Sequence, residues 1–199
     1  MSLPVTVDPA TKAISVDASF IDSLGEESQK DLNEKLLQLN DLSRYLTGLS
    51  LPVPPAPNTI SKQLTDQVNK LRAHGVTQSK AGKHQEALKH FTLAVQLALK
   101  RPPWEAALYV IEEVCGLLAL RADSYMALNL WPEAYTDASL IVLLVPTDPK
   151  GHHRRGRCLQ TIGKYSEARV EYLTASAALP QDTSIKESLA EVEALLAKP

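Results

Sequence analysis

Hydrophobic residues recur every three or four positions over most of this chain, which is the spacing of one face of a helix. From about Ser61 to the C-terminus, this spacing continues with few interruptions. A separate stripe lies within residues 26–48, which we expect to form one amphipathic helix that ends at Gly48. Its leucines share one face: Leu32, Leu36, Leu39, Leu42 and Leu46. The pattern predicts an all-α protein.

Two stretches depart from the helical spacing. Residues 1–22 contain Pro4 and Pro9 and divide into three short pieces, LPVTVD, AISVD and FID, which we expect to be extended. Residues 49–59, LSLPVPPAPNT, contain four prolines and favour a polyproline-II strap. This strap is the clearest boundary in the chain, so we separate an N-terminal region, residues 1–60, from a helical region.

Three similar blocks recur in the helical region: AGKHQEA (81–87), LNLWPEA (128–134) and TIGKYSEA (161–168). The last two blocks end 34 residues apart, which is the period of one known helical repeat. The first two end 47 residues apart, so 13 residues are inserted between them. The insertion contains RPPWE (101–105), and proline suits the first turn of a helix. We therefore expect a long helix that begins at Pro103.

The residues around these blocks resemble the tetratricopeptide repeat (TPR), in which two antiparallel helices, A and B, pack through small residues at fixed offsets. The second repeat departs from the pattern, with Ala138 where a large aromatic residue is usual and Ile141 where alanine is usual. The matching residues are Gly75, Ala87, Phe91 and Ala94 in the first repeat, Ala122, Tyr125, Ala134 and Pro146 in the second, and Gly156, Leu159, Gly163, Tyr165, Ala168, Tyr172, Ala175 and Pro180 in the third.

The TPR resemblance implies an α-solenoid of three helix pairs within residues 61–181, at about 64–100, 103–147 and 149–181. Residues 182–199 would form the polar-faced capping helix that a solenoid needs at its end. Its apolar stripe comprises Ile185, Leu189, Val192 and Leu196. Ser184 and Glu187 have the spacing of a capping box.

Charge and composition exclude several classes of protein. The net charge of −2 gives no global basic field for nucleic acid, so any cationic site must be local. Cys115 and Cys158 fit neither a disulfide framework nor a zinc spacing, and we expect buried, reduced thiols. The N-terminus lacks the features of a signal peptide, and no apolar stretch approaches the roughly 20 residues that span a bilayer.

A local cationic cluster lies on the predicted A helix of the third repeat. Lys150, Arg154 and Arg157 are spaced i, i+4 and i+7 and share one face, which His153 borders. The stretch KGHHRRGRCL (150–159) resembles the "carboxylate clamp" TPR domains, which bind the acidic C-terminal tails of cytosolic Hsp70 and Hsp90. The resemblance implies that Lys150 and Arg154 hold the tail's terminal carboxylates, with Arg72 of the first A helix adding a further cation.

The clamp predicted here is incomplete. The two asparagines of the clamp family map to Val76 and Leu120, neither of which donates a hydrogen bond from its side chain. Asn69 or Gln78 would have to supply the missing donor, and Val76, Leu120 and Met126 would instead contact an aliphatic side chain of the tail. We therefore expect micromolar binding at best, about −8 kcal/mol.

The strap and the long second A helix together resemble the small cytosolic TPR subunits of the fungal translocation complex of the endoplasmic reticulum (ER). That resemblance implies a peripheral adaptor on the cytosolic face of the ER. It would bind the Hsp70 tail in its groove and dock on a membrane-anchored Sec subunit through residues 1–60. It implies no cofactor, no metal and no nucleic-acid partner. The alternative within the same class is a soluble Hsp90/Hsp70 co-chaperone.

Several of these features also have purely structural interpretations. The cationic cluster is also consistent with an ordinary solvated helix face, and the leucine stripe with a self-packed N-terminal helix. Trp104 and Trp131 are expected to be packing residues. An enzyme is disfavoured because the sequence has no phosphate loop, metal-ligand spacing or nucleophile elbow. An RNA-binding repeat is disfavoured because no aromatic residues interleave the cations.

Overall fold

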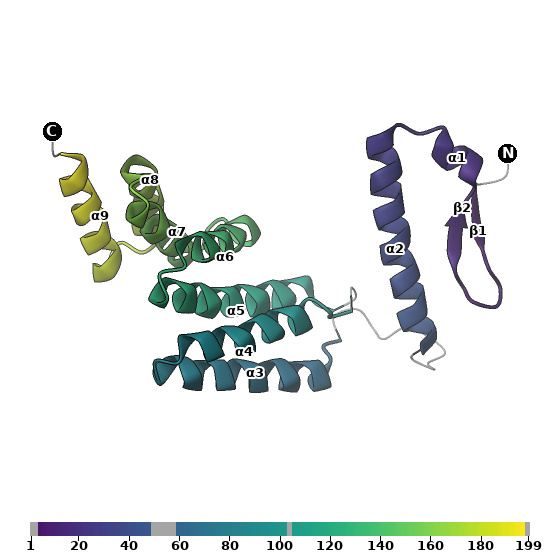
Figure 1. Ribbon diagram of the computed structural model, residues 1–199, viewed down its shortest axis with the longest axis horizontal. Coiled ribbons are helices and arrows are strands. Elements are labelled where there is room, and N and C mark those ends of the chain that lie inside the picture. Colours follow the sequence, from purple (N-terminus) through teal and green to yellow (C-terminus); the bar gives the residue numbers. More distant parts are fainter. Residues whose placement is uncertain (1–3, 49–58, 103–104, 198–199) are drawn as a thin grey trace. The chain divides into compact units, whose positions relative to one another are not determined.

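The computed structural model describes residues 4–48, 59–102 and 105–197, and the chain divides into two compact units, residues 1–56 and 57–199 (Figure 1). The predicted proline-rich strap, except Thr59, lies outside the described residues. Pro103 and Trp104 also lie outside them.

The N-terminal unit consists of a β-hairpin and two helices. Strands β1 (Val5–Val7) and β2 (Ile14–Val16) pair antiparallel, with Val5 opposite Val16 and Val7 opposite Ile14. Helix α1 (Ala18–Asp22) follows, so the prediction that residues 20–22 are extended is wrong. Helix α2 (Glu26–Gly48) has the predicted bounds.

Polar contacts attach the hairpin to α2. The side-chain amide of Asn40 accepts from the backbone N–H of Ile14 at 2.7 Å and donates to the carbonyl of the same residue at 2.8 Å. Ser43 donates to the carbonyl of Lys12. Asn40 thus continues the edge of β2, and Leu39, one of the leucines of the predicted stripe, is 43% exposed.

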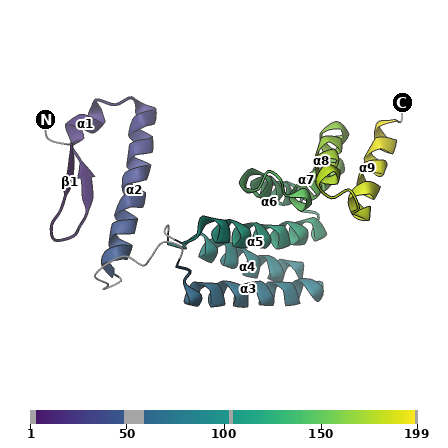
Figure 2. The ribbon, with the colours of Figure 1, turned by 180° about the vertical axis from the view of Figure 1, so that it is seen from behind.

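Over its described residues, 59–102 and 105–197, the second unit is a stack of seven helices, each packed against the next (Figure 2). They are α3 (Lys62–Lys80), α4 (His84–Ala98), α5 (Ala107–Ala127), α6 (Trp131–Leu144), α7 (Pro149–Thr161), α8 (Tyr165–Ala178) and α9 (Thr183–Leu196). The turns within the three pairs need a left-handed backbone at one position, which is occupied by Gly82, Asn129 and Gly163. Helices α3, α5 and α7 are the A helices.

A glycine on the A helix faces a ring on the B helix in two of the three pairs. A Cβ atom on Gly75 would lie 2.5 Å from the ring of Phe91, and one on Gly156 would lie 2.5 Å from the ring of Tyr172. The second pair has Ala122 and Ala138 instead, both buried. There the adjacent Arg121 forms a two-point ion pair with the buried Asp137, at 2.8 and 2.7 Å.

Two predicted helix starts are wrong. Helix α5 begins at Ala107 rather than Pro103, because Glu105 before it lies in a buried ion cluster, in which Arg101 pairs with Glu105 at 2.7 Å and with Glu113 at 2.6 Å. Even so, α5 is the longest A helix, with 21 residues. Helix α9 begins at Thr183 and is capped by Asp182, which accepts from the N–H groups of Ser184 and Ile185, so Ser184 is not the cap.

Candidate peptide-binding groove

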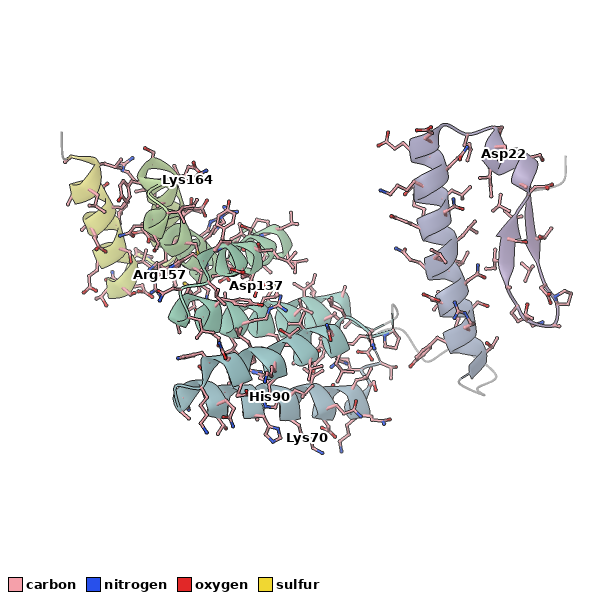
Figure 3. The ribbon with its side chains drawn as sticks, in the orientation of Figure 1. Asp22, Lys70, His90, Asp137, Arg157 and Lys164 are labelled. Carbon is pink, nitrogen blue, oxygen red and sulfur yellow. The ribbon has the colours of Figure 1, made fainter. Side chains whose placement is uncertain are left out.

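The N-terminal end of α7 fixes the register of the cationic cluster. Asp148 is its N-cap and accepts from the N–H groups of Lys150 and Gly151, and Pro149 occupies the first turn. Residues 150, 154 and 157 then lie on one side of the helix. Figure 3 labels Arg157, which lines the space between α7 and α9.

A hollow of about 530 Å³ opens beside this face. Helices α5 and α7 and the N-terminal end of α9 line it, so it collects residues that are distant in the sequence. Its lining consists of Asp123, Met126, Ala127, Lys150, His153, Arg154, Arg157, Asp182 and Ser184. The structure therefore brings Lys150, Arg154 and Arg157 to one site, as the helical spacing predicts.

Arg154 is already paired in this hollow. Its Nε donates to Oδ1 of Asp123 at 2.8 Å and its Nη2 donates to Oδ2 at 2.9 Å. Burial disfavours the charge of Arg154, but the hydrogen bond and the charge of Asp123 outweigh that cost and raise the pKa of the guanidinium. The pairing of Asp123 with Arg154 was not predicted from the sequence.

Lys150 and Arg157 are the exposed cations of the site. In the part of the chain that the structure describes, the side chain of neither residue forms a hydrogen bond or an ion pair. Arg155, by contrast, points to α8 and pairs with Glu171 at 2.6 Å, as expected for a residue rotated off the groove face. The groove thus holds two cations with no partner and one with an internal partner.

His153 forms the wall of the hollow near α9. Its Nε2 lies 3.0 Å from Oγ of Ser188, and its ring lies 5.6 Å from the ring of Tyr172. Burial, with a smaller contribution from the charge of Arg157, lowers the pKa of His153. A neutral imidazole is therefore favoured, so His153 offers hydrogen bonding rather than a fourth charge.

The predicted residues of the first repeat lie elsewhere. Arg72 and Asn69 line a second hollow of about 280 Å³, together with Tyr109, Glu112 and Glu113. Val76 and Leu120 are half-buried and belong to the lining of neither hollow. The two carboxylates beside Arg72 lower the positive potential there, so Arg72 is a weaker candidate than the α7 cations.

Met126, Trp131 and Cys158 belong to one apolar cluster. Met126 is buried and packs with Ala134 and Cys158, so it presents less surface to a ligand than predicted. Trp131 packs against the same cluster, in line with a packing role. Burial raises the pKa of the Cys158 thiol to about 11, which keeps it protonated and unreactive at neutral pH.

Among the described residues, no three His, Cys, Asp or Glu side chains are grouped closely enough to hold a metal ion. Within the same residues, no helix is both long and apolar enough to cross a membrane.

The stacked helix pairs, the glycine–aromatic contacts and the groove on the A helices define a tetratricopeptide-repeat domain. Two TPR structures support this class. The first TPR domain of Spaghetti (RPAP3), bound to the HSP90 peptide SRMEEVD, superposes with a TM-score of 0.58 at 22% identity over 67% of this chain and 95% of that domain. The second TPR domain of human RPAP3, in complex with the HSP70 peptide SGPTIEEVD, superposes with a TM-score of 0.55 at 22% identity over 65% of this chain and 98% of that domain. The predicted all-α solenoid of TPR pairs is confirmed.

Curated relatives specify the family. The subunit sec67 of the ER protein translocation subcomplex of Schizosaccharomyces pombe is 32% identical over 157 residues, covering 79% of this chain and 80% of the relative. Translocation protein SEC72 of Saccharomyces cerevisiae is 29% identical over 163 residues, covering 81% and 83%. The chain belongs to this Sec67/Sec72 family of translocation proteins, as its sequence predicted.

A solved structure extends the similarity to nearly the whole chain. A chain in the cryo-EM structure of the S. cerevisiae Sec complex matches with a TM-score of 0.74 at 25% identity, over 97% of both chains. The match therefore includes the N-terminal unit as well as the repeats. No protein-family model matches the chain.

Proposed function

We propose that this protein is a non-enzymatic adaptor of post-translational translocation into the ER. Its TPR groove binds the acidic C-terminal tail of cytosolic Hsp70, and its N-terminal unit docks on a membrane-anchored Sec subunit, which keeps it peripheral on the cytosolic face. The membership of the Sec67/Sec72 family supports the translocation role. The HSP70 and HSP90 peptides bound by similar TPR domains support the ligand class.

One observation carries the tail-binding proposal: Lys150 and Arg157 line the hollow beside Arg154, and within the described part of the chain their side chains have no partner. A tail that ends in aspartate presents its terminal and side-chain carboxylates together, and each charge-assisted hydrogen bond contributes roughly 1.5–3 kcal/mol. Lys150 and Arg154 hold these two carboxylates, and Arg157 adds to the local positive charge. The missing asparagines keep the affinity in the micromolar range, about −8 kcal/mol.

Calorimetry with an acidic Hsp70 C-terminal peptide tests this assignment. We expect Lys150→Ala and Arg154→Ala each to weaken binding by about tenfold, the effect of one lost charged hydrogen bond. Lys70→Ala is the matched control, because Lys70 is an exposed cation of α3 outside the lining of the hollow (Figure 3). Amidating the peptide's C-terminus should also weaken binding. If Arg154→Ala binds the peptide with unchanged affinity, the assignment of Arg154 to the clamp is wrong.

The docking proposal rests on the exposed apolar surface of the N-terminal unit. None of the described residues of α1 or α2 is buried. Val7 is 56% exposed and Leu37 is 64% exposed. A partner that covers these residues would stabilise the unit and hold the protein at the membrane. A soluble co-chaperone, the competing function, would not need such a surface.

A further inference from the structure

The groove contains a carboxylate of its own at the position where a ligand carboxylate would bind. Asp123 of α5 meets Arg154 of α7 in a two-point arrangement, at 2.8 and 2.9 Å, which is the geometry that a bound carboxylate adopts with arginine. The third nitrogen of the guanidinium, Nη1, donates to the carbonyl of Lys150 at 3.3 Å. Every nitrogen of Arg154 therefore has a partner within the protein.

The pair is placed so that it can open. The side chain of Arg154 is 19% exposed, whereas that of Asp123 is 47% exposed. A carboxylate that is half in water already keeps much of its hydration, so Asp123 can rotate into solvent and leave Arg154. The guanidinium, which is more deeply buried, would remain in place for an incoming carboxylate.

Asp182, the other carboxylate of the hollow, is held differently. Its Oδ1 accepts from the N–H groups of Ser184 and Ile185, at 3.0 and 3.2 Å, as the N-cap of α9. It forms no ion pair with a cation of the hollow among the described residues. Asp182 contributes negative charge to the site but does not occupy the Arg154 guanidinium.

We propose that Asp123 is an internal competitor for the acidic tail, which must displace it from Arg154 to bind. This inference rests on the proposed tail-binding function and adds a residue that sets the affinity of the groove. A single ligand carboxylate can be satisfied by Lys150 and Arg157, whose side chains have no hydrogen-bond or ion-pair partner among the described residues. A second ligand carboxylate can bind Arg154 only by replacing Asp123. Its net gain in binding free energy is therefore the difference between the two interactions with Arg154. Asp123 therefore keeps binding weak and favours ligands that present several carboxylates together.

The test compares two isosteric substitutions in the full chain. Asp123→Asn removes the competitor, whereas Asp182→Asn removes the same charge from the same hollow and retains an N-cap acceptor, since asparagine caps helices as well as aspartate. Calorimetry with the acidic Hsp70 C-terminal peptide should show Asp123→Asn binding about three to five times tighter than wild type. Asp182→Asn should change the affinity less than twofold, because it removes only a negative charge whose effect on the ligand is screened by salt.

The outcomes separate this inference from the function on which it rests. If Asp123→Asn tightens binding no more than Asp182→Asn, Asp123 acts only through its charge and the competition is refuted. If Asp123→Asn weakens binding, Asp123 orients Arg154 for the ligand, which also refutes it. If the wild type binds the peptide but one of these two results is found, the inference about Asp123 is refuted and the proposed tail-binding function still holds. If wild type and both variants fail to bind, the tail-binding function and the inference fall together.

Discussion

The charge of the groove comes mainly from one face of α7. The cluster of Lys150, Arg154 and Arg157 follows from helical spacing, because residues at i, i+4 and i+7 share a face whatever the rest of the fold does. The Asp123–Arg154 pair depends on how α5 and α7 pack, and the two residues are 31 positions apart. Their opposite charges were the signal available in the sequence.

The environment of His153 leads to a pH-dependence prediction. Its pKa is lowered in the folded state by burial and then by Arg157, with Arg154 acting in the same direction and Asp182 and Asp123 opposing. The unfolded state, with a histidine pKa near 6.5, therefore binds the proton more readily. The stability that neutral His153 contributes is fully present above that pH, and it is lost as the pH falls through the folded pKa.

Urea unfolding of wild type and His153→Gln at pH 7.5 and pH 5.5 checks this. We expect the free energy of unfolding of wild type to fall between these pH values by more than that of the variant, because glutamine does not titrate. The other histidines are present in both proteins, so their effects cancel in the comparison. Equal pH dependence in the two proteins would show that His153 is not responsible.

Helix pairs were the most predictable elements. The three similar blocks, each of which ends in Glu-Ala, and the small residues of the repeat located the A and B helices. Small residues are informative because the close crossing of two helices requires one of them at the contact. The starts of α5 and α9 were wrong because tertiary contacts determine them. A buried Arg101–Glu105 pair delays the first, and Asp182 rather than Ser184 caps the second.

The crossing of α7 and α8 gives a prediction at this scale. Gly156→Ala should destabilise the protein by about 1–3 kcal/mol, because the new Cβ would lie 2.5 Å from the ring of Tyr172. That ring cannot shift easily, since it is fully buried and its hydroxyl donates to Oε1 of Gln160 at 2.6 Å.

Gly116→Ala is the matched control for this prediction. A Cβ on Gly116, inside α5, would meet no atom within 4 Å. Alanine is the better helix former, so this variant should gain about 0.5–1 kcal/mol. Urea unfolding monitored by circular dichroism measures both variants. Equal effects from the two substitutions would mean that helix propensity, and not the contact with Tyr172, governs this crossing.

The whole molecule consists of two units that would perform different tasks under the proposed function. The N-terminal unit pairs a hairpin with one long helix through Asn40 and Ser43 and exposes apolar side chains. The second unit has an extended core that includes Val68, Leu118 and Ile141. Contacts of Ser61 fix the start of the second unit: its hydroxyl caps α3, and its N–H donates to Glu105 at 2.9 Å.

Deleting residues 1–58 separates the two tasks while preserving Ser61 and its contacts. We expect the shortened protein to bind the Hsp70 peptide with an affinity within about twofold of the full chain, because the groove is built only from the second unit. Recovery with ER membranes should be lost. A full chain carrying Leu37→Asp provides the control, since it should lose membrane recovery without any deletion. Persistent membrane recovery of the shortened protein would place the anchor in the repeats.

The sequence by itself determined the helices, their pairing into repeats and the cationic face of α7, because periodicity and close-packing requirements are local and repeat along the chain. Only the tertiary structure decided which of those cations are available to a ligand. Charges on different helices interact according to the distances that packing sets, and packing pairs Arg154 with Asp123, leaves Lys150 and Arg157 open, and puts Arg72 in a separate, more acidic hollow.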